Sequence, residues 1–298
     1  MHCPRLDHFA RINHNGKIGK CGHMTGAKEF DSFDEMQNSS WLKNIKNKMQ
    51  DQQWPAECVR CRMTEETTKT SIRLDMIERD RILSAIKKDY LIIGGVLDNV
   101  CNSACQTCHS GLSTKIGSLS SKNYEKINNY EKFFTFPQDR ICEVDVNGGE
   151  PTASPNYKRL LKNLPESVKI LRINTNGSKI VPELEELLSR DMRVIVTLSF
   201  DGVGNGDRVY KDGSDTTASM IQVFKNLNKW GTKYRIRYTI HYLNIDYVYE
   251  DMTHIIKTFK PLRLITSVAW NTLKPEDYKK LETLRKTLRE DWINNRIT

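Results

Sequence analysis

Three cysteines stand close together in the segment VCNSACQTCH, at Cys101, Cys105 and Cys108. A C-x3-C-x2-C loop can bring three thiolates around one small inorganic centre, whereas an odd number of thiols does not suit disulfides. Structural zinc takes four ligands, so a zinc site here would have to borrow His109. A cubane iron–sulfur cluster also normally takes four cysteines, so three would leave one iron open. The loop therefore indicates a metal centre that can bind another molecule.

A second group of cysteines lies near the start of the chain, at Cys3, Cys21, Cys58 and Cys61. The pair in CVRC has the C-x2-C spacing that lets two thiolates reach one metal from a single turn, and the two distant cysteines complete a set of four. Such a set could hold either a 4Fe–4S cluster or a zinc ion that staples a small domain. The spacing alone does not separate the two, and His23 is a further candidate ligand.

Composition limits the class of protein. The chain has 298 residues, of which 38% are hydrophobic and 28% charged, as in ordinary folded proteins. No apolar run is long enough to span a bilayer, and the N-terminus lacks the apolar segment of a signal peptide. We therefore expect a cytoplasmic protein without a disulfide framework. The net charge of +9 favours partners such as nucleic acid or an acidic peptide, although it also suits a plain basic surface.

From about residue 90, apolar strand segments alternate with helical segments. Six strands, each followed by a helix, predict a parallel sheet with right-handed crossovers, either open or curled toward a barrel. The predicted strands are Tyr90–Leu97, Ile141–Val146, Val168–Ile173, Arg193–Phe200, Tyr234–Tyr242 and Leu262–Val268. The predicted helices are Asn123–Phe134, Asn156–Asn163, Val181–Ser189, Thr217–Trp230, Tyr247–Phe259 and Glu276–Asn294.

Polar motifs follow the predicted strands. CNSACQTC follows the first strand, NGGEPT the second and NTNGS the third, while SFDG and HYLN end the fourth and fifth. In such sheets ligands bind at the carboxyl ends of the strands. The motifs should therefore meet on one rim.

The first part of the chain differs from the rest because it is polar and carries cysteines. SSWLKNIKNKMQ predicts a helix capped by Ser39 or Ser40, and Ser71–Ile86 predicts a second helix. We expect a small cysteine-rich module at 1–75, a linker helix at 76–89, the strand–helix domain at 90–270 and a C-terminal helix at 271–298.

The three-cysteine loop after the first strand, together with NGGEP after the second, resembles the signature of radical S-adenosylmethionine (radical SAM) enzymes. The resemblance covers about Tyr90 to Val268 and implies a partial (β/α)6 barrel. It implies that Cys101, Cys105 and Cys108 hold a 4Fe–4S cluster whose open iron binds S-adenosylmethionine. It further implies reductive cleavage of that cofactor to a 5′-deoxyadenosyl radical, which abstracts hydrogen from a substrate.

The resemblance also implies cofactor contacts on the rim. Gly148 and Gly149 would let the backbone approach the methionine end, Glu150 would accept a hydrogen bond from its ammonium group, and Pro151 would stiffen the turn. The remaining candidates are Thr175, Asn176, Ser199 and Asp201, with Arg237 as a partner for the cofactor carboxylate. The residue before the last cysteine, which is aromatic in many relatives, is Thr107 here, and this weakens the adenine contact.

The N-terminal module resembles the auxiliary-cluster modules called SPASM and Twitch, although those usually follow the barrel. Chains in this order are similar to uncharacterised radical SAM proteins encoded by phages, which would place the protein in a host cytoplasm. The resemblance implies a peptide, protein or small-molecule substrate and an electron donor such as flavodoxin or ferredoxin. Two alternatives stay open: a zinc-stapled nucleic-acid-binding protein without catalysis, and a radical SAM enzyme acting on a nucleotide or RNA.

Overall fold

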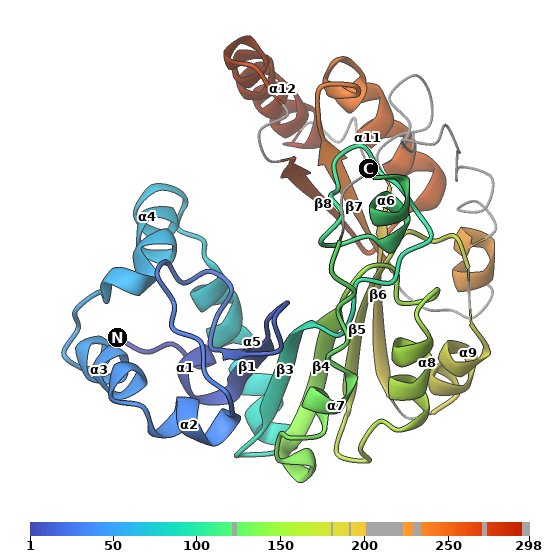
Figure 1. Cartoon of the computed structure of the whole chain (residues 1–298). Helices are drawn as coiled ribbons and strands as arrows, with labels where there is room; N and C mark the ends of the chain where they lie inside the picture. Colours follow the sequence, from blue (N-terminus) through green and yellow to red (C-terminus); the bar gives the residue numbers. More distant parts are fainter. Residues whose placement is uncertain are drawn as a thin grey trace.

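The computed structural model describes residues 1–120, 124–179, 181–190, 192–200, 223–228, 234–269 and 273–293. Within these residues the centre is an eight-stranded sheet in the order β2-β1-β3-β4-β5-β6-β7-β8, in which only the β1–β2 pair is antiparallel (Figure 1). The predicted α/β class with a parallel sheet is confirmed. The strands are β1 (Phe9–Ile12), β2 (Ile18–Gly19), β3 (Leu91–Val96), β4 (Ile141–Asn147), β5 (Ile170–Thr175), β6 (Arg193–Ser199), β7 (Arg235–Ile240) and β8 (Arg263–Val268).

Several helices begin at the polar caps that the sequence predicts. The Ser39 hydroxyl accepts from the Leu42 amide, and the Ser71 hydroxyl from the Leu74 amide. The helices are α1 (Arg5–His8), α2 (Phe33–Asn38), α3 (Ser40–Gln50), η1 (Ala56–Cys58), α4 (Val59–Thr68), α5 (Ile72–Ile86), α6 (Thr114–Leu119), α7 (Tyr130–Phe133), η2 (Gln138–Arg140), α8 (Pro155–Lys162), α9 (Pro182–Leu188), η3 (Ile245–Tyr247), α11 (Val248–Phe259) and α12 (Pro275–Ile293). No described helix has the length and apolar character needed to cross a membrane.

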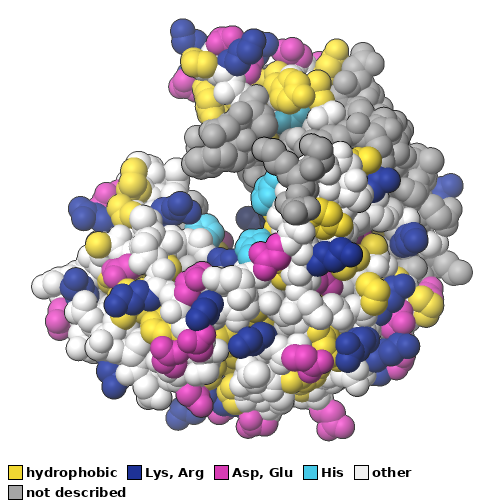
Figure 2. Space-filling view, in the orientation of Figure 1, with side chains coloured by type: hydrophobic (Ala, Val, Ile, Leu, Met, Phe, Trp, Pro, Cys, Tyr) yellow, Lys and Arg dark blue, Asp and Glu magenta, His cyan; other side chains and the backbone are white. Residues whose placement is uncertain are grey.

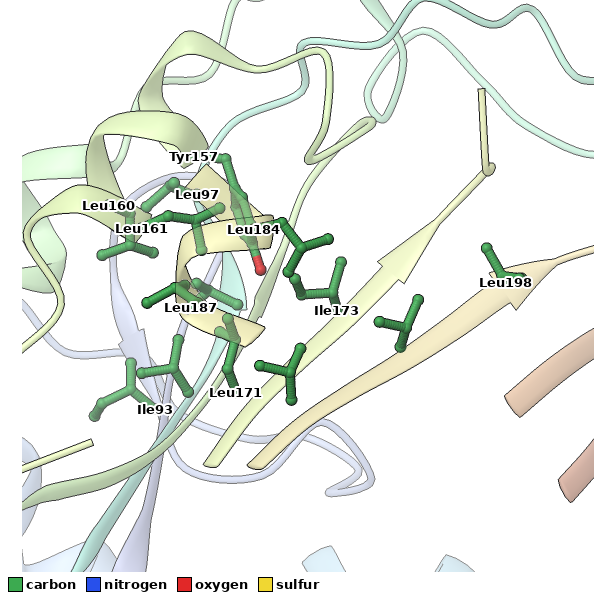
Figure 3. Packing of buried hydrophobic residues seen from close by; sticks show 14 of the residues in the cluster. Ile93, Leu97, Tyr157, Leu160, Leu161, Leu171, Ile173, Leu184, Leu187 and Leu198 are labelled. Carbon is green, nitrogen blue, oxygen red and sulfur yellow. The ribbon is translucent and has the colours of Figure 1, made fainter. Parts of the chain in front are cut away.

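The main core lies between the sheet and the helices that follow its strands. Alternate residues of β5, such as Leu171 and Ile173, point toward α8 and α9 and are fully buried (Figure 3). Tyr157 of α8 and Leu184 of α9 meet them from the helix side. The other residues of the same strands, such as Arg172, belong to the opposite face, where charged side chains lie beside an apolar cluster that includes Ile170 and Ile195. We call this the polar face because of those charged side chains.

The N-terminal residues form a separate lobe with a small core of its own (Figure 1). Leu6, Leu42, Ile45 and Met49 are almost fully buried there, around the cysteine-bearing segments. Helix α5 then returns the chain to the sheet, where Met76 and other residues pack against the first strands. The proposed division into 1–75, 76–89, 90–270 and 271–298 stays a prediction.

Strand β1 was not predicted, and it extends the sheet of the main domain in parallel with β3. The approach of the two strands depends on glycine in β3. A Cβ at Gly95 would lie 2.1 Å from the Ile12 carbonyl oxygen, and one at Gly94 would lie 2.9 Å from the Phe9 ring. The lobe that carries Cys3 and Cys21 is therefore joined to the main sheet by backbone pairing.

The helix predicted at Asn123–Phe134 is wrong for residues 124–129, and only Tyr130–Phe133 is helical. The backbone amides of this segment form hydrogen bonds with residues outside it. The Ile127 amide donates to the Asn99 side chain at 3.0 Å, and the Asn129 amide donates to the Leu97 carbonyl at 2.7 Å. Residues 223–228 of the helix predicted at Thr217–Trp230 are helical, and the rest of that prediction lies outside the described residues.

Candidate cofactor site

The loop that follows β3 presents its three cysteines from a short, tightly bonded turn. The Cys101 amide donates to Thr114 Oγ1 at 3.1 Å, and the Ser103 amide donates to Cys101 Sγ at 3.4 Å. Cys105 and Cys108 both pack against the small apolar cluster formed by Ala104 and Ile116. The loop therefore gathers the three thiols beside the start of α6.

The surroundings of Cys101 change the pKa of its thiol. Burial raises the pKa of the Cys101 thiol; the Ser103 amide opposes this shift, whereas the carboxylate of Glu150 adds to it. A metal cluster takes the thiolate, so cluster binding at this loop would release a proton. His109, the ligand that zinc would have to borrow, is exposed, and its Nδ1 accepts from the Gly111 amide at 3.2 Å.

The NGGEP turn after β4 lies against the cysteine loop. The Glu150 amide donates to the Val100 carbonyl at 2.7 Å. A Cβ at Gly148 would lie 2.2 Å from the Asp98 carbonyl oxygen, and a Cβ at Gly149 would lie 2.2 Å from that of Val100. The absence of a side chain at these two glycines thus permits contact between the two loops. The sequence had instead suggested that the glycines allow the cofactor to approach, and that role stays a prediction.

Glu150 is buried, with 2% of its surface exposed, and its carboxylate accepts four hydrogen bonds. Oε1 accepts from the Thr152 amide at 3.0 Å, from the Thr152 hydroxyl at 2.6 Å and from the Thr175 hydroxyl at 2.5 Å. Oε2 accepts from the Asn176 amide at 2.6 Å. A carboxylate has about four lone-pair sites, two on each oxygen, so Oε2 keeps capacity for a further donor such as an ammonium group.

Asn176 joins the turn after β5 to the cysteine loop. Its side-chain amide donates to Asn102 Oδ1 at 3.0 Å and to Ser103 Oγ at 2.8 Å. Asn102 in turn donates to the Ser178 hydroxyl at 2.8 Å. The motifs after the first, second and third predicted strands therefore form one hydrogen-bonded rim, as their positions in the sequence predicted.

The structure shows fewer contacts for the candidate cofactor residues on β6 and β7. Ser199 is the last residue of β6, and its register partner on β7 is Arg237. The Arg237 side chain is exposed and lines a cavity on the polar face of the sheet. Pro151 is buried in the turn before α8, and Asp201 lies outside the described residues.

The four N-terminal cysteines lie around one cavity. Cys3, Cys21, Cys58 and Cys61 all line it, and so do Arg5, His23 and Glu57. Burial raises the pKa of Cys3 to about 11 and that of Cys58 to about 12, and the neighbouring thiols contribute to both shifts. The four cysteines predicted to form one set thus come from the segment before α1, the loop after β2, η1 and α4.

Both sets supply cysteine thiols, the donors that iron–sulfur clusters and zinc accept, so the residues present fit such groups. Among the described residues, no three His, Cys, Asp or Glu side chains have the spacing of a single-ion site. Cys142, the eighth cysteine, is buried in the cluster that holds Met76 and Tyr90. The identity of the ligands at both cysteine sets stays a prediction.

Two supporting residues were missed from the sequence. The buried Asp98 carboxylate accepts from the Val100 amide at 3.1 Å and from the Ser154 hydroxyl at 2.5 Å. It therefore connects the start of the cysteine loop to the first turn of α8. Asn102, inside the cysteine loop, had no signal beyond its position between two candidate ligands.

No family model matches the chain. Mycofactocin maturase MftC of Mycobacterium ulcerans (strain Agy99) is 28% identical over 132 residues, which are 44% of this chain and 34% of the relative. The MftC of Mycobacterium tuberculosis (strain CDC 1551 / Oshkosh) is 31% identical over 107 residues, or 36% and 26%. The matched part thus spans about a third or less of these curated relatives.

Solved structures share the fold. The enzyme anSMEcpe with bound AdoMet has a TM-score of 0.53 and 22% identity, covering 68% of this chain and 62% of that chain. Streptococcus suis SuiB bound to its precursor peptide SuiA has a TM-score of 0.51 and 16% identity, covering 98% and 70%. The sequence matches are with maturases and the solved structures share the fold, so both agree with the resemblance to radical SAM enzymes that the motifs on the rim indicate.

Proposed function

We propose that this protein is a radical SAM enzyme that modifies a peptide. In this account Cys101, Cys105 and Cys108 hold a 4Fe–4S cluster. The residues of the rim would hold S-adenosylmethionine beside this cluster, and the chemistry supplied there would be one-electron reductive cleavage to methionine and a 5′-deoxyadenosyl radical, with the electron coming from an external donor. The observation that carries the proposal is the hydrogen-bonded rim in which the cysteine loop, the NGGEP turn and Asn176 meet.

The protein's own residues then have defined tasks. Glu150 is held by four donors, so its orientation is fixed before a ligand arrives, and the remaining site on Oε2 can accept from the cofactor's ammonium group. Gly148 and Gly149 hold the turn against the cysteine loop. Ser199 and, by resemblance, Asp201 and Arg237 are candidates for polar contacts to the same cofactor.

A peptide substrate is supported by the proteins this chain is similar to. The mycobacterial relatives are named maturases, and the structure of SuiB contains a precursor peptide. Figure 2 shows a notch between the N-terminal lobe and the rest of the molecule, with histidine and Lys or Arg side chains at its edge. Burial lowers the pKa of His14 in the lobe, and the nearby charges of Arg11 and His109 lower it further, so lobe and cysteine loop approach each other here. A peptide bound in the notch would lie between the lobe that carries the N-terminal cysteines and the loop that carries the other three.

For the N-terminal set we propose a second 4Fe–4S cluster rather than zinc. Four cysteines line one cavity, and the same chain carries the three-cysteine loop for which a cluster is proposed. Four thiolates would leave no open iron, so electron transfer or structural support fits this site better than direct substrate ligation. Reduction by a flavodoxin or ferredoxin is the corresponding proposal for the electron source.

The test is a cysteine substitution in anaerobically reconstituted protein. Cys105→Ala should abolish the reductive formation of 5′-deoxyadenosine, because a cluster at this loop would lose one of three ligands. Cys142→Ala is the matched control, since Cys142 is buried away from both sets, and it should retain the activity. Continued deoxyadenosine formation by Cys105→Ala would overturn the proposal. Bound zinc with no iron would favour the nucleic-acid-binding alternative.

A further inference from the structure

The polar face of the sheet contains a cavity of about 510 Å³. It is lined by residues of β4 to β8 and, from the other side, by α5. Six of the described residues that line it are arginines: Arg79, Arg172, Arg193, Arg235, Arg237 and Arg263. The carboxylates that line it are Asp75, Glu78 and Glu143.

The arginines face the cavity because the strands alternate. In β7, whose sequence is RIRYTI, Ile236 and Tyr238 are fully buried in the core, while Arg235 and Arg237 point the other way. Arg235 is also the register partner of Arg263 on β8. Like charges directly opposite on neighbouring strands are destabilising, so folding alone gives no reason for this pair.

Among the residues that the structure describes, two of the six arginines have a carboxylate partner. Glu143 accepts from Arg172 Nε at 2.6 Å and from Arg79, both at its Oε1. Glu78 is exposed and pairs with Arg81 at 3.5 Å, outside this group. Within the described residues, the other four arginines of the cavity form no ion pair.

The guanidinium groups in the cavity also repel one another. Burial lowers the pKa of Arg235, and the guanidiniums of Arg172 and Arg263 lower it further. Arginine stays protonated despite such shifts, so the repulsion persists. The Arg235 Nε is buried and has no hydrogen-bond partner among the described residues. An anion in the cavity would supply the missing acceptors.

We propose that this cavity binds carboxylate side chains of an acidic peptide substrate. The inference rests on the proposed function, which makes the substrate a peptide. Guanidinium groups bind carboxylates with two parallel hydrogen bonds, and the three unpaired arginines that are not candidates for cofactor contact, Arg193, Arg235 and Arg263, come from three adjacent strands about 4.8 Å apart. Ile72, Ile82 and Ile195 also line the cavity, which suits a ligand with apolar as well as acidic side chains.

The position of the cavity relates it to the reaction centre. Arg237 is the register partner of Ser199, at the carboxyl end of β6, whereas Arg193 and Arg263 begin their strands. The cavity therefore extends from the level of the rim toward the opposite end of the strands. Acidic side chains bound there would anchor a peptide whose reacting residue lies at the rim, and binding remote from the reacting atoms can be used for positioning.

The experiment measures binding of an acetylated and amidated tetraglutamate peptide to the reconstituted protein by calorimetry at low salt, with tetraglutamine as the uncharged reference. We expect tetraglutamate to bind at least about tenfold more tightly. Arg193→Gln/Arg263→Gln should remove at least about tenfold of that affinity, because both side chains are exposed and unpaired. Arg62→Gln/Arg190→Gln, which removes equal charge from exposed pairs elsewhere, should leave it unchanged.

Equal affinity for the two peptides, or equal losses in the two double variants, would overturn the inference. Displacement of tetraglutamate by inorganic phosphate at similar concentration would also overturn it, in favour of a phosphate site. Arg235→Gln tests the same cavity through one residue and serves if the double variant does not fold. Deoxyadenosine formation is measured separately on the unsubstituted protein. If the protein forms deoxyadenosine but does not bind tetraglutamate, only this inference fails. If the protein binds tetraglutamate but does not form deoxyadenosine, the proposed function fails.

Discussion

At the scale of single residues, the account depends on how Glu150 and its neighbours are fixed. A buried carboxylate with four donors is already oriented, so a ligand need not pay the entropy of ordering it. The same network connects three loops that are far apart in the sequence. A change in Glu150 should therefore affect stability as well as cofactor binding.

Glu150→Gln replaces one oxygen with an amide nitrogen, which cannot accept the hydrogen bonds that the carboxylate accepts. At least one buried donor, such as the Asn176 amide, loses its partner, so we expect a loss of about 1–3 kcal/mol in the free energy of unfolding. Urea unfolding measures it. Glu166→Gln, at an exposed position, is the control, and equal stability of the two variants would contradict the network's role.

Gly149→Ala should reduce the iron bound at the cysteine loop. The added Cβ would lie 2.2 Å from the Val100 carbonyl oxygen and 2.8 Å from the Cys101 Cβ, so the loop must move. Gly111→Ala is a matched change in the same region, because its Cβ meets only the exposed His109 ring. Iron analysis should show a loss only for the first variant, and unchanged iron would argue against close packing of the two loops.

Asp145 provides a test by pH. Burial, and then the Glu143 charge, raise the pKa of this carboxyl in the folded protein. The folded state therefore holds the proton more tightly than the unfolded chain, and stability is lost as pH rises above about 4, through the raised pKa. Relative to Asp145→Asn, the unsubstituted protein should lose unfolding free energy between acidic and neutral pH. A constant difference across urea titrations would disprove the shift.

At the scale of secondary structure, the position of α5 depends on Glu143. This carboxylate is almost fully buried and holds Arg79 of α5 and Arg172 of β5 together. Glu143→Gln would leave two guanidiniums without their partner, at a cost of about 2–4 kcal/mol in unfolding free energy, because both are partly exposed. Thermal or urea unfolding measures the loss. Glu186→Gln, which breaks the exposed pair with Arg190, should cost far less, and similar losses would contradict this.

The sequence predicted the strands of the main domain well because their apolar residues alternate or run continuously. It missed β1, whose four residues lack a strong strand pattern and whose pairing depends on the Gly94–Gly95 pair in β3. Glycines inside a strand often mark close backbone contact, so that signal was present. The segment before α7 was misread as helix because its amides bond to Asn99 and Leu97, which no local pattern reveals.

The rim was predictable because parallel strands bring their carboxyl ends together, and the motifs after β3, β4 and β5 do meet there. The arginine cavity was not predicted as a group, since its members are spread from residue 79 to residue 263. Period-2 alternation in RIRYTI was the available signal. It places Arg235 and Arg237 on one face, but their position beside Arg263 of β8 requires the sheet.

At the scale of the whole molecule, the two cysteine sets lie in different lobes of one chain. If each holds a cluster, Cys58→Ala should lower the iron content by about half, from roughly eight to four atoms per chain. Cleavage of S-adenosylmethionine without substrate should persist in this variant, because the cysteine loop after β3 is intact. Iron content that does not change would show that the N-terminal set holds no iron cluster.

The central claim is that the loop carrying Cys101, Cys105 and Cys108 holds a cluster with one open iron. Electron paramagnetic resonance of the reduced, anaerobically reconstituted Cys58→Ala/Cys61→Ala protein tests it most directly, because only two cysteines then remain at the second site. We predict the spectrum of a single 4Fe–4S cluster that changes when S-adenosylmethionine is added. The absence of a cluster signal, or a signal that S-adenosylmethionine does not change, would contradict the account.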